Sequence, residues 1–177
     1  ALPGRPALLP GRQRAGLVAV LPFDDLDRHF MQQALTLARS ATLIGEVPIA
    51  ALLVQEGIVI AEAHNLRETR QDPTAHAELI AIQEGARKTN SWRLTGTTLY
   101  VTLEPCTMCA AAISFARIRR LYFGATDDKG GAVVSGVRFF HAPTCHHAPD
   151  VYPGIAEGES AEMLRSFFQT RRQNPGI

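Results

Sequence analysis

Apolar residues in this chain follow two kinds of spacing, which predict helices alternating with buried strands. Between residues 24 and 43 they recur at helical intervals, and Asp24 and Asp25 stand where such a helix would begin. Residues 49–54 and 58–64 are short apolar runs around a Gly-containing turn, which is typical of a hairpin. The predicted helices are 24–43, 74–87, 105–116 and 161–172, and the predicted strands are 49–54, 58–64, 97–103 and 119–124.

This order of elements predicts an α/β fold. We expect a three-layer α/β/α domain over residues 23–177 with a central mixed sheet, and a fifth strand between residues 130 and 152 stays an open alternative. In helix 74–87 we expect Leu79, Ile82 and Ala86 to form the packing face. Residues 1–22 are rich in Pro, Gly, Ala and Arg, and we expect a disordered N-terminal extension there.

Composition narrows the class of protein. The 177 residues are 46% hydrophobic and 20% charged, as in an ordinary globular domain, and no apolar run approaches the roughly 20 residues of a membrane span. The net charge is only +1, so any nucleic-acid binding must come from a local patch. Three cysteines do not make a disulfide framework, which favours a reducing cytoplasm.

Two short motifs hold the candidate chemistry. Residues 74–78 read Thr-Ala-His-Ala-Glu, and residues 104–109 read Glu-Pro-Cys-Thr-Met-Cys. The imidazole of His76 and the thiolates of Cys106 and Cys109 make a three-ligand zinc set, which leaves the fourth tetrahedral position open. Glu78 lies close enough to touch a water there without binding the metal. The pattern indicates a catalytic rather than a structural zinc site.

The positions of these motifs at predicted helix starts support this interpretation. Residues 72–74, Asp-Pro-Thr, and Pro105 are both helix-start signals. Cys106 and Cys109 are three residues apart, so they share a helical face, and the N-terminal dipole favours their thiolates.

The H-x-E and P-C-x-x-C motifs resemble those of the cytidine/nucleotide deaminase superfamily. Residues 72–82 (DPTAHAELIAI), 99–113 (LYVTLEPCTMCAAAI) and 166–173 (SFFQTRRQ) resemble, more narrowly, the bacterial tRNA-specific adenosine deaminases, over about residues 30–173. The resemblance implies a cytidine-deaminase-like fold, one Zn²⁺ per chain, proton transfer by Glu78, and conversion of adenosine to inosine at the tRNA wobble position. It also implies a cytoplasmic homodimer.

The resemblance further implies which residues contact substrate. Asn65 matches an asparagine that hydrogen-bonds the nucleoside, although the residue alone is equally typical of a turn that bonds its own backbone. The Ala77 backbone would add a hydrogen bond to the base. The anticodon stem-loop would be contacted from the C-terminal helix by Phe168, Arg171 and Arg172.

Alternatives remain at this point. The same motifs occur in deaminases of free cytosine, guanine or their nucleosides, and a zinc-stabilised RNA-binding module without turnover belongs to another class. Glu78 argues against the module, because a structural zinc gives that carboxylate no role. A loop also contains His141, Cys145, His146 and His147, but lacks the spacing of a second metal site.

Overall fold

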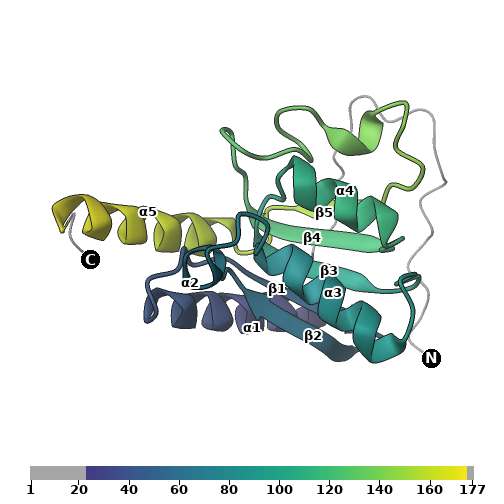
Figure 1. Ribbon diagram of the computed structural model, residues 1–177, viewed down its shortest axis with the longest axis horizontal. Helices are drawn as coiled ribbons and strands as arrows, with labels where there is room; N and C mark the ends of the chain where they lie inside the picture. The colour runs from purple at the N-terminus through teal and green to yellow at the C-terminus, as the bar shows by residue number, and fades with distance from the viewer. Residues whose placement is uncertain (1–22, 175–177) are drawn as a thin grey trace.

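The computed structural model describes residues 23–174, which form a five-stranded sheet covered by helices on both faces (Figure 1). The predicted disorder of residues 1–22 lies outside the described residues and stays a prediction. The helices are α1 (Asp25–Thr42), α2 (Arg67–Arg70), α3 (Ala77–Thr89), α4 (Thr107–Phe115), α5 (Glu157–Gln173) and the 3-10 helix η1 (Phe139–His141). The strands are β1 (Ala50–Gln55), β2 (Ile58–His64), β3 (Thr98–Leu103), β4 (Arg120–Ala125) and β5 (Asp150–Pro153).

The sheet has the strand order β2-β1-β3-β4-β5. Strand β1 is antiparallel to both β2 and β3, whereas β3, β4 and β5 are mutually parallel, so the predicted mixed sheet is confirmed. Helix α4 connects the parallel strands β3 and β4. In such a connection the carboxyl ends of the strands and the start of the helix meet at one edge, where α/β folds place their sites.

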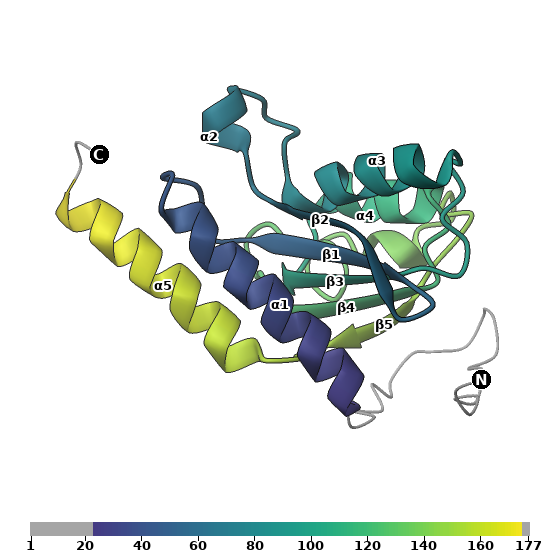
Figure 2. The same cartoon turned by 90° about the horizontal axis from the view of Figure 1, so that it is seen from below.

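The two faces of the sheet are covered by different helices, which confirms the three-layer architecture (Figure 2). Helices α1 and α5 lie on one face, and α3 and α4 lie on the other. Under α1, the rings of Tyr100, Tyr122 and Tyr152 stack across β3, β4 and β5, with centroids 4.8 and 4.5 Å apart. Under α3 and α4 the core is aliphatic and includes Leu53 and Ile113.

The histidine helix begins three residues later than predicted, at Ala77 rather than Thr74. The side chain of Asp72 accepts hydrogen bonds from the backbone N–H and the hydroxyl of Thr74, at 2.8 and 2.7 Å, which closes a turn instead of capping a helix. His76 is consequently the N-cap of α3, and Cys106 is likewise the N-cap of α4. Both ligand candidates therefore stand at the helix entrance, in extended backbone.

The predicted packing face of α3 is confirmed only in part, because Ile82 packs against the core as a half-buried side chain. Leu79, Ile82 and Ala86 are only half-buried, while the fully buried side of the helix is lined by smaller residues, Ala77, Ala81 and Gly85, together with Ile80. A Cβ atom on Gly85 would lie 2.4 Å from the Cδ2 atom of Leu53 in β1. The small residues therefore let α3 approach the sheet closely.

The fifth strand, which the sequence left open, exists at Asp150–Pro153. Two elements differ from the prediction: helix α2 was not predicted, and α5 begins at Glu157, four residues before the predicted start. No helix within residues 23–174 is long and apolar enough to cross a membrane.

Candidate active site

The structure brings the three predicted metal ligands together from two helix entrances. The Nδ1 atom of His76 lies 3.7 Å from the Sγ atom of Cys106 and 3.6 Å from that of Cys109. All three ligand atoms lie within 4.8 Å of one another. Zn–S and Zn–N bonds of about 2.3 and 2.0–2.1 Å at a tetrahedral angle place sulfur and nitrogen about 3.6 Å apart, so the donor set fits zinc.

The two thiols differ in acidity. A hydrogen bond from Cys109, followed by the contact with His76, lowers the pKa of Cys106 to about 4. The same bond, with burial second, raises the pKa of Cys109, and the hydrogen bond to Cys106 raises the pKa of His76. One thiolate is thus already favoured at the start of α4, where the free backbone N–H groups and the helix dipole stabilise negative charge.

The carboxyl group of Glu78 lies inside this cluster. The residue is only 4% exposed, and its carboxyl group hydrogen-bonds the thiol of Cys109 and its own backbone N–H. Burial raises the pKa of Glu78 to about 7. A carboxyl group in this range can both accept and donate a proton near neutral pH, which is what general acid–base chemistry needs.

Asn65 connects the end of β2 to the start of α3. Its side-chain oxygen accepts a hydrogen bond from the backbone N–H of Ala77 at 3.0 Å, and the residue is buried. The side chain therefore does not close a turn on its own backbone. The N–H of Ala77 is engaged in this bond, so it is not free to donate to a ligand. The side-chain NH₂ of Asn65 can donate instead.

Glu104 has a role that sequence reasoning missed. Its carboxylate is 2% exposed and accepts five hydrogen bonds from one loop, at 2.8–3.1 Å. The donors are the backbone N–H groups of Asp127, Val133, Val134 and Ser135 and the hydroxyl of Ser135. Although burial raises the pKa of Glu104, these bonds outweigh it and hold the pKa below the usual value. The one sequence signal for this role is the position of Glu104, a carboxylate directly after a buried strand.

The loop bound by Glu104 lies directly against the ligand set. Gly131 pairs with Cys106 in an isolated antiparallel bridge, and the N–H of Ala132 donates to the carbonyl of Pro105 at 2.9 Å. A Cβ atom on Gly131 would lie 2.5 Å from the Glu104 carboxyl group, so only glycine fits this position without a shift. Glu104 therefore holds a wall of the site in place.

A second buried carboxylate holds the segment before α3. Glu46, 1% exposed, accepts hydrogen bonds through one oxygen from the backbone N–H and the hydroxyl of Thr69 in α2, at 2.6 and 2.7 Å. Helix α2 and the following turn connect Asn65 to His76. Through Thr69, Glu46 thus holds in place the segment that connects Asn65 to His76.

The structure does not join the predicted α5 residues to the ligand set. The guanidinium of Arg171 donates to the carbonyl of Gly45 at 3.1 Å and stacks over Phe167 at 5.1 Å. Phe168 is 43% exposed, and Arg172 is exposed and bonds only the carbonyl of Phe168, one turn back. Phe168 and Arg172 therefore share the open face of α5, whereas Arg171 fastens the helix to the turn after α1.

The histidine-rich loop is fastened to α4 by other contacts. The hydroxyl of Ser114 donates to the carbonyl of His147 at 2.6 Å and lies 3.5 Å from the thiol of Cys145. The Nε2 atom of His147 lies 2.7 Å from the carbonyl oxygen of Ile118. These contacts give Cys145 and His147 a structural role, whereas His141 and His146 are exposed.

Comparison with known proteins identifies relatives with the same architecture. Residues 25–172 match the family of MafB19-like deaminases. The chain is 63% identical over 144 residues to the tRNA-specific adenosine deaminase of Agrobacterium fabrum, covering 81% of this chain and 95% of the relative. A solved structure from a study of A-to-I editing by tRNA:A34 deaminases is 64% identical, with a TM-score of 0.76 over 77% of this chain and 99% of the other. The guanine deaminase of Bacillus subtilis is 28% identical, with a TM-score of 0.57 over 84% of this chain and 95% of the other.

Proposed function

Since the chain belongs to the family of tRNA-specific adenosine deaminases, we propose that it hydrolyses adenosine to inosine at the wobble position of tRNA. The observation that supports this most is the buried Glu78 carboxyl group beside a complete His76, Cys106 and Cys109 donor set. Identity of 63% over nearly the whole relative favours the same substrate.

In this proposal, His76, Cys106 and Cys109 hold one Zn²⁺ per chain. Zinc in such a site lowers the pKa of a bound water toward about 7 and so makes a nucleophile available at neutral pH. The cluster of ligands at two helix entrances suits this role, because α3 and α4 hold the three side chains at the carboxyl end of β3.

Glu78 moves the protons. Its carboxylate accepts one proton from the attacking water and delivers it to N1 of adenine, while oxygen adds to C6. The carboxylate then takes the second proton from the new C6 hydroxyl and passes it to the departing amine, so that ammonia leaves and the C6 carbonyl of inosine forms. A pKa of about 7 suits this task, since the group accepts and gives up a proton twice in each turnover.

Substrate binding divides between two regions. Asn65 donates a hydrogen bond to the base from its side-chain amide, and the Ala77 backbone, which Asn65 holds in place, borders the same space. On α5, Phe168 stacks an unpaired anticodon base and Arg172 pairs with phosphate, because both are exposed on one face. Arg171 contributes by holding α5 against the α1–β1 turn and by adding positive charge.

The chain acts as a homodimer in the cytoplasm in this proposal. The outward side of α4 is apolar, with Met108, Ala111 and Ala112 half-buried and Phe115 66% exposed. No described residue covers Phe115, so a second copy has an apolar seat there. Three free cysteines suit a reducing compartment.

The decisive experiment measures ammonia release from tRNA, from free adenosine and from guanine. We expect turnover on tRNA alone; turnover on guanine without tRNA would favour the guanine deaminase function that the Bacillus subtilis structure represents. Glu78→Gln should retain zinc and lose at least about 10²-fold in rate. Glu84→Gln, on the same helix, is the matched control and should keep its rate.

A further inference from the structure

Positive charge is unevenly distributed along this nearly neutral chain. The whole sequence has 18 Lys and Arg against 17 Asp and Glu. From Gly85 to Thr126, however, Glu104 is the only carboxylate, and it is buried beside the ligand set. The same stretch has six cationic side chains, namely Arg87, Lys88, Arg93, Arg117, Arg119 and Arg120.

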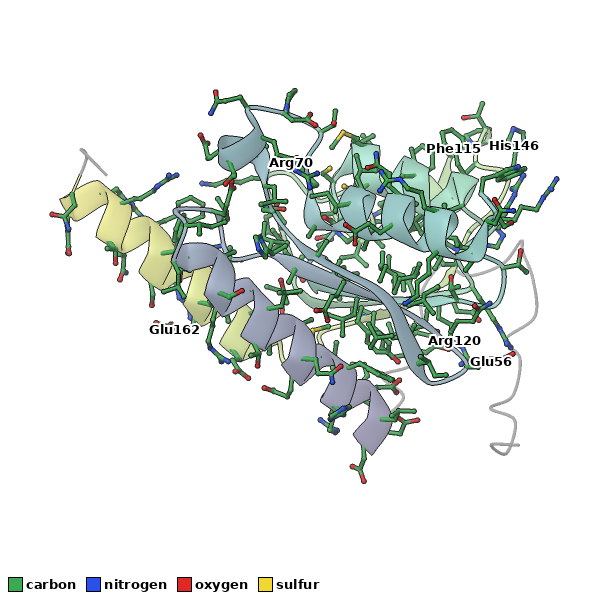
Figure 3. The ribbon with its side chains drawn as sticks, turned by 60° about the horizontal axis from the view of Figure 1, so that its bottom comes forward. Glu56, Arg70, Phe115, Arg120, His146 and Glu162 are labelled. Atoms are coloured by element: carbon green, nitrogen blue, oxygen red, sulfur yellow. The ribbon has the colours of Figure 1, made fainter. Side chains whose placement is uncertain are left out.

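The fold gathers these cations at one end of the molecule. Helices α3 and α4 end there, and β3 and β4 begin there, because both helices run opposite to the strands that follow them. The N–H of Leu94 donates to the carbonyl of Ala116 at 2.7 Å, which joins the two loops. Figure 3 shows Arg120 beside Glu56 of the β1–β2 turn, and both lie away from Arg70 in the segment before α3.

Most of these cations have no acidic partner. The arginines that form ion pairs within residues 23–174 are Arg39 and Arg165, and both lie elsewhere. The Nε atom of Arg120 is buried and has no hydrogen-bond partner. Asp150 lies beside Arg120 in the parallel register of β4 and β5, yet no ion pair joins them. Glu56 also lies beside Arg120 (Figure 3), but the six cationic side chains still outnumber the carboxylates at this end, so its local charge is positive.

An aromatic side chain lies within the same region. Trp92 is 57% exposed, and the guanidinium of Arg93 lies 4.1 Å above its ring. An exposed tryptophan adjoining several arginines can stack a nucleobase while the arginines pair with phosphates. Helix-dipole compensation accounts for Arg87 and Lys88 in the last turn of α3, but not for the loop residues.

We propose that a distal basic surface binds the substrate RNA outside its anticodon arm. This surface consists of Trp92, Arg93, Arg117, Arg119 and Arg120. This inference rests on the proposed function. The surface and the ligand set lie at opposite ends of β3, whose six residues span about 20 Å at roughly 3.3 Å each. An RNA whose loop occupies the site must therefore extend well beyond the loop to reach the surface, as a full-length tRNA does.

The test compares full-length tRNA with the isolated anticodon stem-loop across a salt series. Arg93→Ala/Arg119→Ala should weaken binding of full-length tRNA and shallow its log–log salt slope by about 1.4–1.8, since each phosphate contact contributes about 0.7–0.9. Binding of the stem-loop should stay unchanged. Arg28→Glu, on α1, alters the net charge by the same two units and is the matched control. Zinc content and thermal midpoint verify that each variant is folded.

The outcomes separate the two proposals. Unchanged affinity and slope for tRNA in the double variant, with a wild type that binds and deaminates tRNA, would overturn the distal basic surface alone. An equal loss for tRNA and stem-loop would place the arginines in the anticodon contact and overturn the inference too. A wild type that neither binds nor deaminates tRNA would overturn the proposed function itself.

Discussion

Replacing Glu104 by glutamine tests whether the wall of the site depends on one buried charge. Glutamine keeps the oxygen that accepts from Val133, Val134 and Ser135, but puts an amide NH₂ opposite the N–H of Asp127. Leaving the N–H of Asp127 without an acceptor costs about 1–2 kcal/mol. The three hydrogen bonds that remain no longer reach a charged oxygen, so each weakens by about 0.5–1 kcal/mol. We therefore expect the free energy of unfolding to fall by about 3–4 kcal/mol.

The loss should depend on pH in a defined direction. The folded pKa of Glu104 is held below the unfolded value of about 4.5, so the carboxylate stabilises the fold fully above that pH. This stabilisation is lost as the pH falls through the folded pKa. The difference between wild type and Glu104→Gln should therefore be constant at neutral pH and should shrink below about pH 4.5.

Urea unfolding followed by circular dichroism at pH 7 and at about pH 4 measures both quantities. Glu162→Gln is the matched control, because Glu162 is an exposed glutamate paired with Arg165 on α5 and should leave the neutral-pH stability nearly unchanged. A loss under about 1 kcal/mol at pH 7, or a difference that does not change with pH, would refute the role given to the charge of Glu104.

Substitutions at four other positions probe separate contacts. Glu46→Gln should keep both hydrogen bonds from Thr69, because both reach a single oxygen. Glu46→Leu leaves these buried donors without an acceptor, which costs about 1–2 kcal/mol and should lower the thermal midpoint by about 2–8 °C in a melting curve. Gly85→Ala should destabilise by about 1–3 kcal/mol in urea, since its Cβ would meet a leucine methyl group at 2.4 Å; an unchanged midpoint would mean that α3 shifts freely. Arg172→Ala should make the log–log salt slope of tRNA binding shallower by about 0.7 without changing stability. Arg171→Ala should also lower the thermal midpoint, because it removes the bond to Gly45. Identical effects of the two variants would contradict the separate roles of Arg171 and Arg172.

The sequence predicted that His76, Cys106 and Cys109 come together, because each of the two motifs is local. His76 with Glu78, and Cys106 with Cys109, are close neighbours along the chain, and the bounds of β2 were predicted residue for residue. The partners of Glu104 and Glu46 could not be predicted, because they lie 23–31 residues away and are mostly backbone N–H groups, which almost any sequence offers.

Small residues explain the other errors. The fully buried side of α3 is lined by Ala77, Ala81 and Gly85, which give a weaker apolar signal than the half-buried Leu79 and Ile82, so the helical pattern missed the most deeply buried side. A side chain that closes a turn, as Asp72 does, is also indistinguishable in sequence from one that caps a helix.

The distribution of aromatic residues separates the optical signals of this protein. The single tryptophan of the chain is Trp92, which is exposed beside Arg93 and does not belong to the stack of tyrosines beneath α1. Emission excited at the indole absorption edge therefore reports the environment of the loop before β3, whereas the near-ultraviolet dichroism of Tyr100, Tyr122 and Tyr152 reports the packed sheet. Binding at one end of the molecule and order in its interior can thus be followed separately, in one cuvette and without an added label.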